Sequence, residues 1–133
     1  MLFRSLIECR VSVGAVRLKA LAKRLLDGGC VALYVIGNRR EARLLSAAFD
    51  MWVRRRRDTG VMRHTPYSQY EMGWKKETLE EALEWFVMPM GATDHNLVAT
   101  IGDADGHSRL MSAFARVVGD RRERLSAGVL AEK

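Results

Sequence analysis

Two aspartates in the C-terminal half have the type and spacing that could support catalysis. Asp103 and Asp105 follow the apolar run Leu97–Ile101, and each has a glycine beside it. Carboxylates at the end of a strand are the ligands that divalent metal ions take in phosphoryl-transfer sites. Such a site also needs a glutamate at the end of a second strand, and the candidate strand end, residues 35–38, has none. Asp-Ala-Asp-Gly is also ordinary turn chemistry, so we expect no metal ion here.

A block of four arginines, Arg54–Arg57, is the second feature that could carry function. It follows an amphipathic pattern in which Ala42, Leu45, Ala48 and Phe49 recur at helical spacing. Consecutive helical positions point about 100° apart, so the four arginines are expected to form a collar of positive charge. Structured RNA is bound through its phosphates and its shape, which such a collar suits. The alternative is a solvated helix end, where cations are favoured by the helix dipole.

The charge is unevenly distributed along the chain. The 133 residues carry a net charge of +6, which points to an acidic partner. Residues 1–65 hold 14 Lys and Arg against 5 Asp and Glu, whereas residues 66–133 hold 8 against 11. The N-terminal half is therefore predicted to bind the polyanion. The candidate RNA-binding residues are Arg10, Arg17, Lys19, Lys23, Arg39, Arg40, Arg43, Arg54, Arg55, Arg56, Arg57 and Arg63.

Other chemistries have little support. Cys9 and Cys30 are isolated cysteines, which fits a reducing compartment and gives neither a disulfide framework nor a zinc ribbon. The three histidines have no partner four residues away, and no apolar run approaches the roughly 20 residues that cross a bilayer. We therefore predict a protein that is not an enzyme, with no cofactor, no metal ion, no membrane and no small-molecule substrate.

Periodicity and turn residues predict the elements. Asp27-Gly28-Gly29 suits a left-handed helix C-cap, and Asn38 is a good helix N-cap. Cys30–Ile36 could be a buried strand or a short buried helix, and the second half of Glu77–Met88 is equally open between helix and strand. The remaining expectations are helices at residues 2–8, 15–26, 39–57 and 108–124, strands at 9–13, 61–65 and 97–101, a connection at 66–76 and a tight turn at 102–106.

These elements predict an α/β (α+β) fold. We expect two layers, with helices packed on a short mixed sheet and a C-terminal strand–helix extension. The division is residues 1–88 as a basic RNA-binding domain and 89–133 as an extension packed on it. The basic, serine-containing segment 1–26 resembles an organelle transit peptide, and the alternative, which we favour, is that it forms the first elements of the fold.

The order of several short segments resembles bacterial-type large-subunit ribosomal protein family seventeen. That family has a helix ending in a Ser-Leu-Ile-like triplet, a short Arg-Ile strand, further helices, a Gly-Gly-Tyr-Thr-Arg strand and a closing strand. The Gly-Gly-Tyr-Thr-Arg motif survives only as Gly60-Val61-Met62-Arg63. The matches are Ser5-Leu6-Ile7, Arg10-Val11, Ala22–Leu26, Gly60, Arg63 and Glu84–Val87.

This resemblance implies a structural constituent of the large ribosomal subunit. Its partners would be rRNA, through the basic half, and neighbouring ribosomal proteins. It also favours a helix at residues 30–36. The diverged pattern favours a mitochondrial ribosome, with a bacterial, cytoplasmic one as the alternative.

Two other resemblances compete with this assignment. The chi subunit of the bacterial clamp loader also has a strand followed by a helix with a Leu-Trp-like end, here Phe49-Asp50-Met51-Trp52. A Phe-Leu-Pro-His-like motif follows in that family, reduced here to Val61–His64. That resemblance implies a protein-interaction module on DNA replication machinery. The aspartate pair resembles a Toprim-type site, which would make the chain a metal-dependent nucleic-acid enzyme.

Overall fold

The computed structural model describes residues 2–58, 65–70, 79–87 and 95–131. Strands and helices alternate along these residues. The elements are β1 (Phe3–Cys9), α1 (Ala15–Gly28), β2 (Cys30–Gly37), α2 (Arg39–Asp58), β3 (Tyr67–Tyr70), α3 (Leu79–Val87), β4 (Asn96–Ile101) and α4 (Ala104–Ala131).

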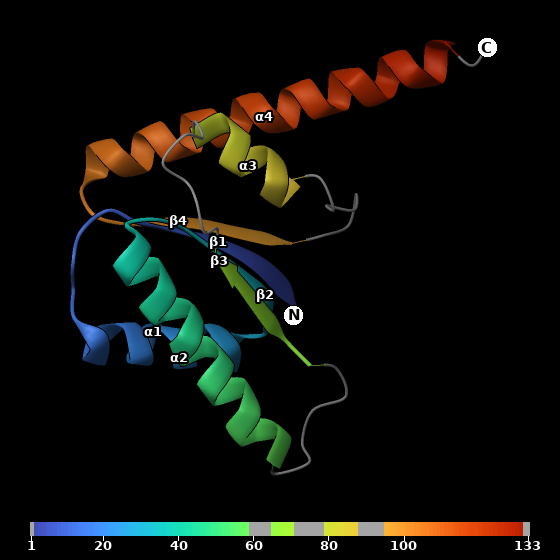
Figure 1. Ribbon diagram of the computed structural model, residues 1–133. Coiled ribbons are helices and arrows are strands. Elements are labelled where there is room, and N and C mark those ends of the chain that lie inside the picture. Colours follow the sequence, from blue (N-terminus) through green and yellow to red (C-terminus); the bar gives the residue numbers. More distant parts are fainter. Residues whose placement is uncertain (1, 59–64, 71–78, 88–94, 132–133) are drawn as a thin grey trace.

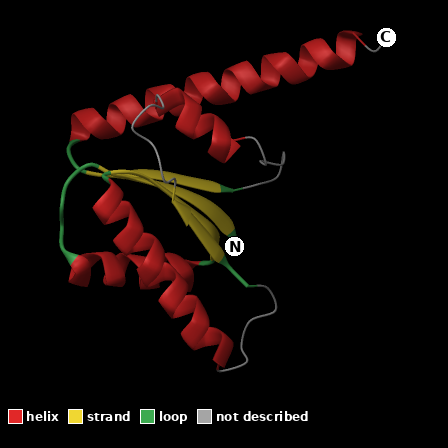
Figure 2. Ribbon diagram, in the orientation of Figure 1, coloured by secondary structure: helices red, strands yellow, loops and turns green. Residues whose placement is uncertain are grey.

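The described strands form one parallel sheet in the order β3-β2-β1-β4. A parallel neighbour is reached only through a crossover connection, and α1, α2 and α3 lie in these connections. Helices α1 and α2 cover one face of the sheet, and α3 and α4 cover the other (Figure 1, Figure 2). Starting from β1, the chain adds β2 and then β3 on one side of this strand. It later returns to add β4 on the other side of β1.

Each face of the sheet has its own apolar core. Phe49 of α2 is fully buried on the α1/α2 face, and Phe86 of α3 is fully buried on the α3/α4 face. Strand β1 serves both cores, because Ile7 points into the first and Leu6 into the second. Alternate residues of a strand point to opposite faces, so a central strand of this sheet is buried on both sides.

Strand β1 corrects two predictions. Residues 2–8 were expected to be a helix and Cys9–Val13 a strand, but the strand runs from Phe3 to Cys9 and residues 10–14 connect it to α1. The polar residues of this segment resembled the solvent face of a helix. In the fold Ser5 and Glu8 are buried, at 0 % and 5 % exposure. Because polar residues occupy buried positions, the segment lacks the alternation of apolar and polar residues that would predict a strand.

Helices α1 and α2 agree with the prediction, and β2 decides between the two alternatives left open for its segment. Helix α1 ends at Gly28, and Gly29 caps it with a left-handed φ of 107° and an N–H that donates to the Leu25 and Leu26 carbonyl oxygens. Cys30–Gly37 forms a strand, which decides the alternative left open and does not match the helix that the ribosomal resemblance favours. The Asn38 side-chain oxygen accepts a hydrogen bond from the Arg40 N–H at 3.1 Å, which confirms the predicted N-cap of α2.

The C-terminal half differs in detail. Residues 79–87 form a helix throughout, and β3 lies in the segment predicted as a connection. Helix α4 begins inside the expected turn, because the Asp103 carboxylate accepts the Gly106 N–H at 2.8 Å and caps it. The strand predicted at 61–65 lies outside the described residues except for Thr65.

The predicted class, helices packed on a short sheet with a C-terminal strand and helix, is confirmed. Two details differ from the prediction. The described strand pairs are all parallel, not mixed, and helices cover both faces of the sheet. Strand β4 pairs with β1 over six residues, so the C-terminal segment belongs to the same sheet as the basic half.

Candidate functional site

The predicted basic residues gather mainly on one face of the molecule, the layer of α1 and α2. Helix α1 carries four Lys and Arg against one acid, and α2 carries seven Arg against three acids. On the opposite face α3 has three Glu and no basic residue, and α4 has five Arg against three acids. Of the predicted residues, α1 holds Arg17, Lys19 and Lys23, and α2 holds Arg39, Arg40, Arg43, Arg54, Arg55, Arg56 and Arg57.

Trp52 joins the two helices of this layer. Its indole N–H donates a hydrogen bond to the backbone carbonyl oxygen of Lys19 at 3.1 Å. The Lys23 ammonium lies 5.6 Å from the ring centroid, and the Arg55 guanidinium carbon lies 5.0 Å from it. Both distances are within the range of cation–π attraction. A half-buried aromatic ring thus holds two of the predicted basic side chains against the α1–α2 contact.

The arginines of the block 54–57 have different surroundings and do not form a uniform collar of positive charge. Arg54 is exposed, Arg55 lies over Trp52, and Arg56 forms an ion pair with Asp27 of α1. Arg56 also donates to the Leu26 carbonyl oxygen at 3.4 Å, so it helps to hold α1 against α2. The Arg57 side chain and all of Arg63 lie outside what the structure describes.

An apolar groove runs between the two basic helices. Leu44, Ala47 and Met51 line it from α2, spaced three and four residues apart, so they share one helical face. Leu44 is 37 % exposed although it is a large apolar side chain. The complete lining is Ala15, Lys19, Leu44, Ala47, Ala48 and Met51.

Basic residues continue the same face of α2 beyond the groove. Arg40 lies four residues before Leu44, and Arg54 lies three residues after Met51. Both are exposed, and helical spacing places them in line with the apolar stripe. This second stripe was not predicted, because the apolar stripe that enters the core dominates the pattern of α2, although the same three- and four-residue spacing marks it in the sequence.

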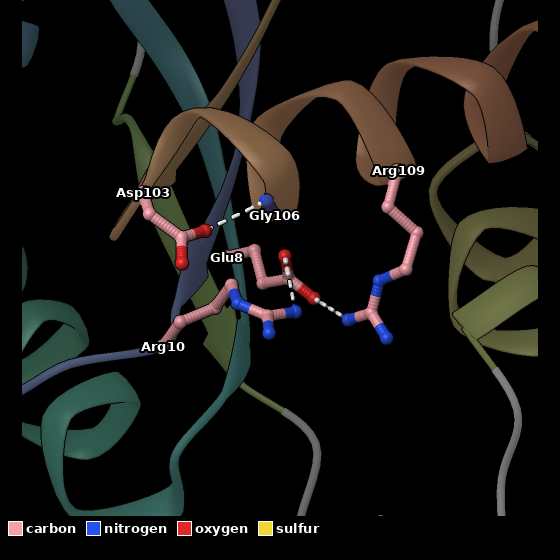
Figure 3. A network of polar contacts seen from close by, with 5 residues as sticks. All are labelled: Glu8, Arg10, Asp103, Gly106 and Arg109. Atoms are coloured by element: carbon pink, nitrogen blue, oxygen red, sulfur yellow. Dashed lines mark hydrogen bonds and ion pairs between the residues drawn. The ribbon is translucent and has the colours of Figure 1, made fainter.

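Arg10 lies apart from the basic layer, in a polar cluster at the carboxyl ends of β1 and β4 (Figure 3). The Glu8 side chain is 6 % exposed, and its Oε2 accepts a hydrogen bond from Arg109 Nη2 at 3.5 Å. Arg10 Nη1 lies 3.9 Å from the other carboxylate oxygen of Glu8. Burial raises the pKa of Glu8, and the charges of Arg109 and Arg10 partly oppose that rise.

Glu8 lies where a metal site of the Toprim type would need a glutamate. No glutamate was predicted at a strand end, yet Glu8 stands near the end of β1, beside β4 and the aspartate pair. Its carboxylate faces two guanidinium groups, and Asp103 caps α4 through the Gly106 N–H. Among the described residues, no group of three or more His, Cys, Asp or Glu could hold a metal ion.

The cysteines lie inside the core on the α1/α2 face. Burial raises the pKa of Cys9 and of Cys30 to about 12, so both thiols stay protonated at neutral pH. In the part of the chain that the structure describes, no helix is long and apolar enough to span a bilayer.

Comparisons with protein families, with curated proteins and with solved structures found no match for this chain.

Proposed function

We propose that this protein is a protein-interaction module, similar in role to the chi subunit of the bacterial clamp loader. Its docking surface is the groove between α1 and α2, and the segment that docks there is an acidic amphipathic helix of a partner protein. The observation that carries the proposal is an apolar floor with cationic residues at its ends.

The apolar floor favours a protein partner over a nucleic acid. Leu44, Ala47 and Met51 offer apolar area that phosphates cannot cover, whereas the apolar face of a helix can. Lys19 at the groove, and Arg40 and Arg54 beyond its two ends on the same face of α2, would attract acidic side chains on the rim of such a helix.

The order of elements also supports the chi-like role over the ribosomal one. The chi resemblance implies a strand followed by a helix with a Leu-Trp-like end. Strand β2 followed by α2 fits this order, with α2 continuing six residues past Trp52 to Asp58. The ribosomal resemblance implies a helix ending at Ser5-Leu6-Ile7 and another at residues 30–36. Both segments are strands, so the fold lends that resemblance no support.

Binding of structured RNA, as in a large ribosomal subunit, is the second candidate. It rests on the exposed arginines of α2: Arg39, Arg40, Arg43 and Arg54 form no ion pair with another described residue. Cations of this kind can neutralise phosphates without an apolar floor. The two candidates therefore differ in whether Leu44 contributes to affinity.

A charge substitution in the groove tests the proposal. Leu44→Glu places a carboxylate where the apolar face of the partner helix would pack, and Met111→Glu makes the same kind of change on α4, on the opposite face, at a similar exposure of 40 % against 37 %. We expect the groove variant to lose at least about tenfold in affinity for its protein partner and the α4 variant to bind normally. Equal binding by both variants, or loss of RNA in place of protein, would reject the proposal.

A further inference from the structure

The groove between α1 and α2 is hollowed because small side chains form its floor. Ala15 comes from α1, and Ala47 and Ala48 come from α2. The larger side chains of Leu44 and Met51 stand about one turn before and one turn after Ala47, on the same face of α2. This face of α2 therefore dips at Ala47, between two larger side chains.

The space in the groove matches one large apolar side chain. Its volume is about 180 Å³, and an apolar cavity of roughly 150 Å³ holds a benzene ring. Among the described residues that line the groove, Lys19 alone carries a charge. A lysine can lay its methylene chain along an apolar wall and keep its ammonium group in water. The groove therefore suits a leucine or phenylalanine side chain better than a polar one.

Val16 adds an apolar contact on the α1 side. Its side chain is 82 % exposed. It follows the lining residue Ala15 and lies three residues before Lys19, so helical spacing places it beside the groove. A single exposed apolar side chain is ordinary on a protein surface. Here, however, a helix lying in the groove would cover apolar side chains from both helices, Val16 of α1 and Leu44 of α2.

Two exposed arginines of α2 are placed symmetrically about the dip. Arg40 lies seven residues before Ala47, and Arg54 lies seven residues after it. Seven residues are about two helical turns, or roughly 10 Å along the axis, so both arginines return to the face that carries Ala47. Neither forms an ion pair with another described residue. The groove thus presents one apolar position with a cation about two turns away in each direction.

We propose that the partner helix binds through one leucine or phenylalanine inserted at Ala47, with acidic residues seven positions before and seven positions after this anchor. The anchor rests on the proposed docking function of the groove and specifies what the partner must carry. Two helices packed at a small crossing angle have the same rise per residue, so positions that meet at the anchor meet again two turns away. Apolar side chains that fill central pockets supply most of the affinity, and charge pairs towards the ends fix the register.

Designed peptides test the anchor. The probe is a fluorescently labelled, alanine-rich helical peptide of about 20 residues, with a central phenylalanine and a glutamate seven positions to either side. We expect binding, measured by anisotropy, that weakens as the salt concentration rises. Replacing the phenylalanine by alanine should cost at least about tenfold in affinity. A control peptide of the same composition carries its glutamates five positions from the anchor, on a different face, and should bind more weakly.

Ala47→Leu fills the dip from the protein side. Ala47 is exposed, so the larger side chain should leave urea unfolding unchanged and reduce the affinity for the phenylalanine peptide at least about tenfold. Ala115→Leu is the matched control, because Ala115 is also exposed and belongs to α4 on the opposite face of the sheet (Figure 1). We expect this control to bind the peptide normally.

The outcomes separate the anchor from the docking groove. Peptide binding that Leu44→Glu abolishes and Ala47→Leu leaves intact would overturn the anchor and keep the groove as the docking surface. Binding that neither variant weakens occurs elsewhere and counts against both. If the phenylalanine peptide does not bind at about 1 mM, or binds no better than its alanine version, the anchor is rejected. Leu44→Glu with the natural protein partner then decides the proposed function by itself.

Discussion

The indole N–H of Trp52 donates a hydrogen bond to the backbone carbonyl oxygen of Lys19, 3.1 Å away on the neighbouring helix. This bond joins α2 to α1 beside the groove, where Lys19 is also a lining residue. The separation of the two groove walls thus depends on a side chain that lies between them. A change at Trp52 is expected to affect both stability and docking.

Trp52→Phe removes the hydrogen bond and keeps an aromatic ring. We expect a loss of about 1 kcal/mol in the free energy of unfolding, measured by urea denaturation, together with weaker binding of the partner. Tyr67→Phe is the control, because it removes the bond between the Tyr67 and Tyr34 hydroxyl groups, away from the groove. Unchanged docking by the Trp52 variant would show that the hydrogen bond between Trp52 and Lys19 does not determine the shape of the groove.

Substitution of two glycines separates backbone strain from steric collision. Gly14 and Gly37 both have positive φ, at 89° and 99°, but a Cβ at Gly14 would meet nothing within 4 Å, whereas one at Gly37 would collide with the carbonyl oxygen of Cys9. We expect Gly14→Ala to cost about 1–3 kcal/mol through strain alone, and Gly37→Ala to cost clearly more. Equal losses in thermal or urea unfolding would mean that the end of β1 can move to admit a side chain.

Substitutions in the arginine block test whether Arg54 contributes to binding and Arg56 to stability. Arg54 is exposed, and Arg56 is paired with Asp27. If the basic layer meets a polyanion, Arg54→Gln should reduce affinity and lower the salt slope by up to about one unit, with stability unchanged. Arg56→Gln should instead lower stability, because it removes a contact between α1 and α2. The reverse pattern would contradict these assignments. Heparin or RNA binding at several salt concentrations and urea unfolding measure the two effects.

Glu8 should make stability depend on pH in the direction opposite to that of a typical carboxylate. Burial raises its pKa in the folded protein above the ordinary value of 4.5, so the folded state holds this proton more tightly than the unfolded state. The stabilisation is present below pH 4.5 and is lost as the pH rises through the folded pKa. Relative to wild type, Glu8→Gln should therefore gain stability across that interval. Urea unfolding at a series of pH values measures the difference, and one that stays constant with pH would refute the assignment.

The sequence predicted elements that have one buried face and clear ends. Helices α1 and α2 have an apolar stripe and glycine or Asn38 at a terminus, and both were found. Strand β1 was missed because both of its faces are buried, so that Ser5 and Glu8 break the hydrophobic period. Strand β3, Tyr67–Tyr70, has only four residues at the sheet edge, and its pairing with β2 rather than its composition makes it a strand.

The candidate site could be predicted only in part, because it depends on contacts between residues that are distant along the chain. The basic residues of α1 and α2 were identified one by one, but their assembly into one layer follows from the packing of the two helices. Arg10 was grouped with them by charge and sequence position. The fold instead places it with Glu8 and Arg109, a residue 101 positions from Glu8 along the chain, and no local pattern could indicate that contact.

Photo-crosslinking from the groove tests whether a partner helix docks between α1 and α2. A photoreactive residue at Leu44, introduced into the full chain in its host, is compared with one at Met111 on the opposite face. We expect crosslinks from Leu44 to acidic amphipathic helices of a protein partner, reduced at high salt, and few from Met111. Nuclease-sensitive crosslinks to RNA from Leu44, or the same protein products from both positions, would contradict it.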